Sequence, residues 1–299
     1  MRACLIAVAA AVSVGAAPPK PPTPNDIVAS SPAAAWKAIN PDNLLVIDLK
    51  SGGRVIIQLA PAFTPVHVGN VKALARAGHW SGAAIYRVQD NYVAQWGNGD
   101  NEKPWPAGVD PTPPAEYTRA LRGLKVTPLG SRDPYAPAAG FADGWPVAYS
   151  LKGNWANLAH CYGTVGVGRG LAPDTGSGSE LYAVIGHGPR QLDRNIAVIG
   201  RVIEGIEHMN TLPRGTEALG FYKDQAQHVP IANVRIAADM PEAERPHFQL
   251  MDTRSRTFAR YLEVRSHRFD DFYRRPALGV DLCNVQVPVR RTPAAPAGS

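Results

Sequence analysis

The sequence lacks the motifs of several large enzyme classes. It contains no Gly-x-Ser-x-Gly motif, so Ser177 and Ser179 do not belong to the nucleophile elbow of a hydrolase. The glycine-rich stretch at 166–170 is followed by LAPDTGSG rather than by a helix, which argues against a dinucleotide-binding turn. The eight histidines do not have the spacing of zinc ligands. We therefore expect neither a metal nor a cofactor.

The sequence also has little that could cross a membrane. Its one long apolar run follows Arg2 and ends in small residues, so residues 1–17 have the layout of a signal peptide. This run is too short to span a bilayer comfortably, and no other stretch is long enough. The sequence therefore predicts an exported protein, periplasmic or secreted, with no membrane span after signal cleavage.

Cysteine is scarce, with three residues in the chain. Cys4 lies within the predicted signal peptide, which leaves Cys161 and Cys283. In an oxidising compartment these two could pair, but the sequence does not show whether they meet. The oligomeric state is equally undetermined by the sequence.

The N-terminal part is predicted to hold a lead-in and a short helix. Residues 18–43 begin with a polar, proline-rich segment that is typical of a flexible linker. Ser31 and Pro32 then fit a helix cap followed by proline in the first turn, which predicts a helix over AAAWKAIN.

A β-hairpin follows, with strands at 44–50 and 54–60 around a Ser-Gly-Gly turn. The alternation of Val55, Ile57 and Leu59 predicts that one face of the second strand is buried and the other exposed.

One amphipathic helix and several short strands make up the rest of the core. Residues 64–78 begin with Thr-Pro, end at Gly78 and have an apolar stripe, which predicts a helix. A second, short helix is expected at 205–212. The remaining strand-like segments are two short strands, one with Ile85, Arg87 and Val88 and one with Tyr92 and Val93, followed by 163–170, 181–187, 196–205 and 229–238. About eight strands and two helices without βαβ alternation predict a mainly β fold, a closed antiparallel barrel with helices at its ends.

Two segments do not fit this barrel. Residues 101–162 are rich in proline, glycine and tryptophan and have poor periodicity, which predicts a long surface insertion with little local structure. Residues 240–299 form a C-terminal extension in which acidic residues are interspersed among many arginines. A solvated face is the favoured interpretation of this charge, and no nucleic-acid binding is expected.

From Leu44 to about Asp239 the sequence resembles the cyclophilin family of peptidyl-prolyl cis-trans isomerases. The resemblance rests on five blocks in the family's order: VIIQLAPAFTPVHVGNVKALARAGHWSGAAIYRV, YVAQWGNGD, GTVGVGR, GSELYAVIG and LDRNIAVIGRVIEGIEHMN. It implies an eight-stranded antiparallel barrel capped by two helices over 44–239, interrupted by the insertion 101–162. It also implies isomerisation of X–Pro bonds in proline-containing polypeptides without a cofactor.

The resemblance implies a catalytic role for Arg87, which matches the essential arginine of the family. Rotation about an X–Pro bond crosses a barrier of about 18–20 kcal/mol because amide resonance is lost. A guanidinium, which is always charged, can stabilise the lone pair that forms on the prolyl nitrogen. The positions that match substrate-binding residues of the family are Tyr92, Val93, Gln95, Gly168, Arg169, Glu180, Tyr182 and Leu192. Tyr92, Val93, Tyr182 and Leu192 would form the proline pocket, and Gln95 with the backbone at Gly168–Arg169 would align the substrate.

Several positions depart from the family pattern. Tyr86 replaces a histidine, Glu180 a glutamine and Ile196 a histidine or tyrosine, so a charge could enter the groove and one substrate hydrogen bond could be lost. Gln191 stands where cyclosporin-sensitive members carry tryptophan, which implies weak sensitivity to that drug. Tyrosines in place of two phenylalanines would make the pocket more polar. We expect activity at a reduced or altered level.

Two other functions stay open at this point. The barrel could be a catalytically weak module that binds peptides or proteins, with the insertion or the extension contacting a partner. A basic adaptor could instead bind nucleic acid or lipid through the arginine-rich stretch 254–275.

Overall fold

The computed structural model describes residues 20–99, 103–270 and 272–292. The predicted signal peptide, residues 1–17, lies outside the described residues. Among the residues that are described, no helix has the length and apolar character needed to cross a membrane.

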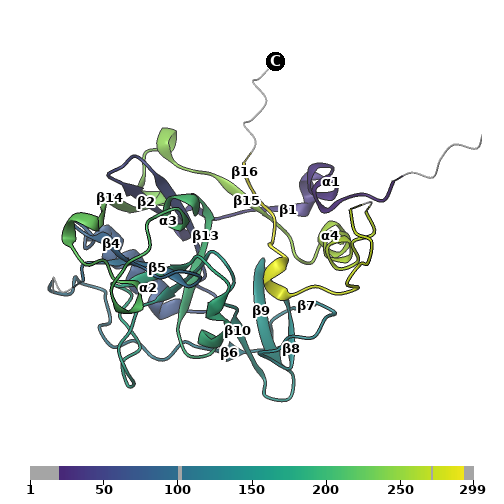
Figure 1. The fold of residues 1–299 in the computed structure, drawn as a ribbon, viewed down its shortest axis with the longest axis horizontal. Coiled ribbons are helices and arrows are strands. Elements are labelled where there is room, and N and C mark those ends of the chain that lie inside the picture. The colour runs from purple at the N-terminus through teal and green to yellow at the C-terminus, as the bar shows by residue number, and fades with distance from the viewer. Residues whose placement is uncertain (1–19, 100–102, 271, 293–299) are drawn as a thin grey trace, which may run out of the picture.

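Eight antiparallel strands close into a barrel, as the sequence predicted. The strand order around the barrel is β11-β12-β5-β4-β14-β2-β3-β13, and β13 pairs with β11 to close it. The strands are β2 (Leu44–Leu49), β3 (Arg54–Leu59), β4 (Ala84–Val88), β5 (Val93–Gly97), β11 (Thr164–Val167), β12 (Leu181–Val184), β13 (Val198–Glu204) and β14 (Val229–Ile236). Figure 1 shows the barrel on one side of the molecule and the additional elements on the other.

Two helices pack against the barrel core, and both were predicted. α2 (Pro65–Arg76) buries Val68, Val71 and Leu74 in the main apolar cluster, and α3 (Glu207–Asn210) adds Met209. Thr64 precedes α2 but does not cap it with its side chain, because its hydroxyl donates to the carbonyl of Val198.

The prediction of a helix over AAAWKAIN is wrong. The first helix is α1 (Pro24–Ala29), where Thr23 and Asp26 form a capping box in the segment that was expected to be a flexible lead-in. Residues Ala33–Ala35 form one 3₁₀ turn, and Trp36–Ala38 is strand β1. Pairing of β1 with a strand of the C-terminal extension outweighs the helix propensity of the alanines.

The insertion is also more ordered than predicted, because it contains a five-stranded antiparallel sheet. The sheet has the order β6-β10-β9-β8-β7. Its strands are β6 (Arg119–Ala120), β7 (Thr127–Pro128), β8 (Ala138–Ala142), β9 (Trp145–Ser150) and β10 (Trp155–Leu158). Asp143 and Gly144 join β8 to β9 with φ values of 48° and 86°, the conformation of a tight hairpin turn. The Asp-Gly pair was a hairpin signal that the poor periodicity of its surroundings concealed.

The C-terminal extension covers the outside of the barrel. It contains β15 (Phe248–Met251), α4 (Arg256–Ser266) and β16 (Val289–Arg291), and β15 lies between β1 and β16 in a three-stranded sheet. Phe248 and Leu250 pack with Ile56 of β3 in one buried cluster. The expectation that one face of β3 is exposed is therefore wrong: Ile56, on that face, is fully buried.

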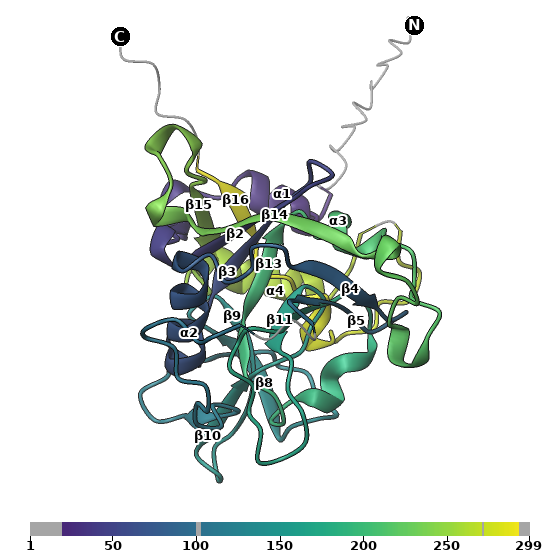
Figure 2. The same cartoon turned by 90° about the vertical axis from the view of Figure 1, so that its left-hand side faces the viewer.

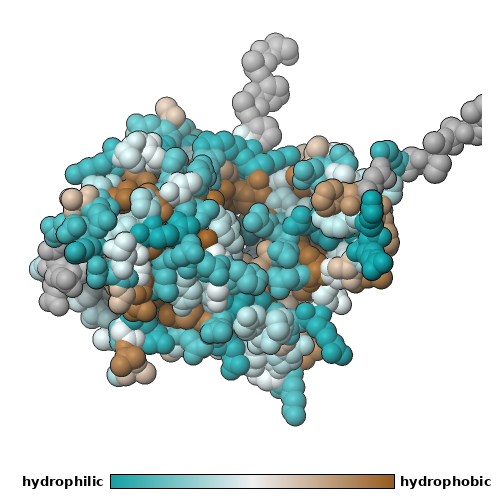
Figure 3. Space-filling view, viewed as in Figure 1, coloured by the Kyte–Doolittle hydropathy of each residue, from teal (hydrophilic) through white to brown (hydrophobic). Residues whose placement is uncertain are grey.

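Short 3₁₀ turns connect these elements: η1 (Ala33–Ala35), η2 (Pro41–Asn43), η3 (Gly188–Leu192), η4 (Ala218–Gly220), η5 (Gln225–Gln227), η6 (Ala237–Asp239), η7 (Glu242–Glu244) and η8 (Leu282–Asn284). In Figure 2, β15, β16 and α1 lie at one end of the molecule and β10 of the inserted sheet at the other. A disulfide joins Cys161, at the end of the insertion, to Cys283 in the extension. The surface in Figure 3 is mostly hydrophilic, with scattered apolar patches.

Candidate functional site

Neighbouring strands bring Arg87 and Gln95 together. Arg87 on β4 lies opposite Gln95 on β5, and the register of this pair shifts between Ile85 and Arg87. An irregularity of this kind changes the direction in which neighbouring side chains point. As a result, both Tyr86 and Arg87 hydrogen-bond to the side chain of Gln95.

Three hydrogen bonds hold the guanidinium of Arg87. It donates to Gln95 Oε1 at 2.9 Å, to Gln89 Oε1 at 2.6 Å and to the carbonyl of Leu219 at 2.7 Å. A guanidinium has five N–H groups, so these contacts leave two for another acceptor. Burial lowers the pKa of Arg87, and the phenol groups of Tyr92 and other nearby tyrosines act against this shift. The group stays charged at neutral pH.

Gln95 belongs to a chain of hydrogen bonds with a defined direction, which we call the polar chain (Arg87, Gln95, Tyr86 and Glu180). The Tyr86 hydroxyl donates to Glu180 Oε2 at 2.5 Å and accepts from Gln95 Nε2 at 2.7 Å. Glu180 Oε1 accepts from the backbone of Asn98 and Gly99. Because a carboxylate can only accept, it sets the Tyr86 hydroxyl as a donor and thereby directs Gln95 Oε1 toward Arg87. Burial, followed by the charge of Glu180, raises the pKa of Tyr86 well above its usual range.

The four side chains predicted to form the proline pocket lie in one small apolar cluster. Val93 and Tyr182 are buried there with Val184, and Tyr92, Leu192 and Ile196 pack against them while staying partly exposed. We call this group the apolar cluster. It is separate from the main core of the barrel. The structure thus brings Tyr92, Val93, Tyr182 and Leu192 together, and the predicted departure Ile196 joins them.

The predicted backbone contact region lies beside Gln95. A Cβ atom on Gly168 would be 3.4 Å from Gln95 Nε2 and 3.1 Å from Glu180 Cβ, so a side chain would crowd this corner. The guanidinium of Arg169 donates to the carbonyls of Asn195 and Gly170. Its side chain therefore ties the loop after β11 to the loop before β13.

Two contacts to the site were missed by the sequence analysis. The ring of Phe221 lies 5.4 Å from the Arg87 guanidinium carbon and stacks on Tyr86, and Leu219 supplies the carbonyl noted above. No local pattern marks this loop, because it meets Arg87 across 132 positions of sequence. The second contact is that of His160, which no sequence pattern marks: its Nε2 lies 3.1 Å from the Tyr182 hydroxyl.

Two cavities are bordered by residues of this site or by their chain neighbours. One of about 320 Å³ is bordered by Glu180, His79, Lys103 and Trp105. Another of about 380 Å³ is bordered by Gln191 and Asp193, the neighbours of Leu192, and by Tyr135 and Asn157 of the insertion. Glu180 of the polar chain therefore borders one hollow, and the chain neighbours of Leu192 in the apolar cluster border the other.

Comparison with known proteins agrees with this geometry. The family model described as cyclophilin type peptidyl-prolyl cis-trans isomerase/CLD matches residues 44–238. Proteins described as probable peptidyl-prolyl cis-trans isomerases from Brucella suis and Brucella abortus are 27% identical over 184 residues, which is 60% of this chain and 76% of each relative. The crystal structure of cyclophilin AquaCyp293 from Hirschia baltica is 22% identical, with a TM-score of 0.69 over 91% of this chain and 98% of that one.

The fold and these matches define a class of enzyme, the peptidyl-prolyl cis-trans isomerases. Within that class, this chain belongs to the cyclophilin family.

Proposed function

We propose that this chain isomerises X–Pro bonds of exported polypeptides, with Arg87 as the electrostatic catalyst. The observation that carries the proposal is the placement of the Arg87 guanidinium. Gln95 and Gln89 hold it by hydrogen bonds, and Gln95 pairs in register with Tyr182 of the apolar cluster. Such a site needs no nucleophile and no acid–base pair, since the reaction breaks no bond other than the partial double bond of the amide.

The mechanism follows from what changes as the bond twists. In the planar amide the prolyl nitrogen shares its lone pair with the carbonyl, and in the twisted state it regains that pair. A fixed N–H of Arg87 would interact more strongly with the twisted state, and only such differential stabilisation lowers the barrier. The apolar cluster would hold the proline ring while the preceding carbonyl rotates. Gln95 Nε2 has one N–H beyond its bond to Tyr86 and would align the substrate backbone.

Two observations support export. The first is the signal-like layout of residues 1–17, and the second is the disulfide between Cys161 and Cys283, since such bonds persist in oxidising compartments. Fractionation of cells that express the full chain, followed by N-terminal sequencing, tests this part. A mature protein that begins near residue 18 outside the cytoplasm is expected, and an uncleaved chain in the cytoplasm would contradict it.

The catalytic role is tested by Arg87→Ala in a proline-isomerisation assay on a tetrapeptide with a central Ala-Pro bond. Loss of one electrostatic donor of this kind should lower kcat/KM by about 10²–10³-fold. Arg119→Ala is a matched control, because Arg119 also lies 5.4 Å from a phenylalanine ring and donates to a backbone carbonyl. Full activity of Arg87→Ala would rule out the proposed mechanism.

A second candidate function is a catalytically weak module that binds proline-containing segments. It is favoured by one observation: the Leu219 carbonyl and the Phe221 ring already occupy part of the Arg87 guanidinium. The wild-type protein would then bind the tetrapeptide but give no isomerisation rate above background.

A further inference from the structure

The hydroxyl of Tyr182 is buried and has a specific partner. Tyr182 is 5% exposed and His160 is 2% exposed, and their rings lie nearly parallel with centroids 6.4 Å apart. A buried hydroxyl without a partner costs about 1–3 kcal/mol, whereas a phenylalanine at this position would need none. His160 therefore compensates for the tyrosine at position 182.

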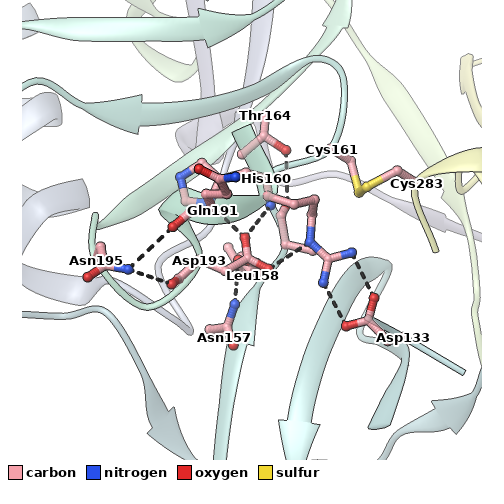
Figure 4. Close-up of polar contacts among 12 residues, drawn as sticks. Asp133, Asn157, Leu158, His160, Cys161, Thr164, Gln191, Asp193, Asn195 and Cys283 are labelled. Carbon is pink, nitrogen blue, oxygen red and sulfur yellow. Dashed lines mark hydrogen bonds and ion pairs between the residues drawn. A yellow bond between two sulfur atoms is a disulfide. The ribbon is translucent and has the colours of Figure 1, made fainter. Parts of the chain in front are cut away.

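A carboxylate fixes the orientation of the His160 ring. Asp193 Oδ1 lies 2.9 Å from His160 Nδ1 and also accepts the His160 backbone N–H at 2.9 Å (Figure 4). In neutral imidazole, Nδ1 then carries the proton, and Nε2 accepts from the Tyr182 hydroxyl. The hydroxyl is thereby held toward the interior of the protein, and the pocket keeps an apolar ring.

The same carboxylate connects the pocket to the insertion. Asp193 Oδ2 accepts from Arg190 Nε at 2.7 Å, and the other two Arg190 nitrogens contact both oxygens of Asp133 at 3.0 and 2.7 Å. These three side chains are at most 7% exposed. Burial disfavours the charge of Asp193, but the hydrogen bond from His160 and the charge of Arg190 outweigh it, and the pKa of Asp193 is lowered.

Two pocket residues depend on this network. The hydroxyl of Tyr182 has its partner in His160, near the end of the insertion, and Leu192 lies between Arg190 and Asp193 in the chain. We propose that His160 is a positioning residue for the proline pocket: with Asp193 it holds Tyr182 and couples substrate binding to the inserted sheet. This inference deepens the proposed function and rests on it.

A double-mutant cycle tests the proposal with the full chain. Its variants are His160→Leu, Tyr182→Phe and both together, and its readouts are the Kd of the Ala-Pro tetrapeptide and kcat/KM. Each single change should weaken binding by about five- to tenfold, because one buried partner is left unpaired. The double variant should bind no worse than either single variant, since both partners are then removed. If the double variant showed a loss of affinity equal to the product of the two single losses, the proposal would be overturned.

Further variants separate positioning from folding. His160→Gln retains an amide that can meet the hydroxyl and should bind the peptide within about twofold of wild type. If His160→Leu does not fold, His160→Phe, which keeps a ring but has no acceptor, replaces it in the cycle with the same expectation. His67→Leu is the control, because His67 is also a buried histidine with a carboxylate partner, Glu116, but lies on α2. It should lower the unfolding midpoint and leave the Kd unchanged.

The test of the His160 role can fail or succeed independently of the test of catalysis. A protein that binds the peptide without catalysing isomerisation would contradict the proposed function, and the cycle measured on Kd would still decide the role of His160.

Discussion

The two sides of the candidate site are built in different ways. The polar chain is contained in the cyclophilin-like part of the sequence, where Arg87, Tyr86, Gln95 and Glu180 all lie on or next to barrel strands. The apolar cluster also comes from the barrel, but its Tyr182 needs His160 of the insertion as a hydrogen-bond partner.

One part of the site therefore depends on barrel residues alone, and the other also depends on contacts from the insertion. The hydrogen bonds that link the members of the polar chain run between residues on or next to barrel strands, so changes in the insertion should leave them intact. The apolar cluster depends on a network that ends at Asp133, and the disulfide begins at Cys161, directly after His160. Perturbing the added segments should therefore affect proline binding before it affects the position of Arg87.

The largest expected effect comes from removing the disulfide. Cys161 and Cys283 are 122 positions apart, and a crosslink that closes so long a loop stabilises a protein by about 2–5 kcal/mol. The double variant Cys161→Ala/Cys283→Ala should lose that much free energy of unfolding in urea denaturation. It should also bind the Ala-Pro tetrapeptide more weakly, because His160 adjoins the crosslink. The same experiment on wild-type protein with a reductant is the control, and an unchanged midpoint in both would contradict the expectation.

Alkaline pH should weaken both sides of the site. Burial raises the pKa of Tyr182 and of Tyr86 well above 10, the value expected in the unfolded chain. Below pH 10 both phenols are neutral in both states, and their contribution to stability is fully present. Above pH 10 the unfolded chain loses these protons first, so each tyrosine should cost about 1.4 kcal/mol per pH unit until the pH reaches its folded pKa.

Thermal unfolding between pH 8 and 11 measures this loss. Tyr182→Phe and Tyr86→Phe should each make the free energy of unfolding fall less steeply with pH. Equal slopes for both variants and the wild type would show that these two tyrosines do not cause the loss. Tyr92→Phe is the control, because the hydroxyl of Tyr92 makes no hydrogen bond within the described residues.

The barrel and most of the site could be predicted from the sequence. The strands and α2 carry strong local patterns, and the family blocks place Arg87, Gln95 and the pocket residues at defined positions. The structure brings these residues together as expected, and their roles stay predictions.

The parts that could not be predicted depend on contacts between distant segments. Trp36–Ala38 becomes a strand because β15 pairs with it, and Ile56 is buried because the extension covers it. The partnership of His160 with Tyr182 joins residues 22 positions apart without any periodic signal. The turn at Asp143 is the exception, since an Asp-Gly pair with positive φ values is a local hairpin signal that needs no distant contact.

The smallest expected effect concerns the polar chain itself. Tyr86→Phe removes the hydroxyl that links Gln95 to Glu180, so Gln95 can rotate its amide away from Arg87. One such hydrogen bond is worth about 1 kcal/mol, which predicts a fall in kcat/KM of about fivefold. Tyr261→Phe, which loses a hydroxyl that donates to the carbonyl of Gln286 near α4, should have no effect on the rate. If Tyr86→Phe matched Tyr261→Phe, the polar chain would have no part in orienting Gln95, and Arg87 would act with its other contacts alone.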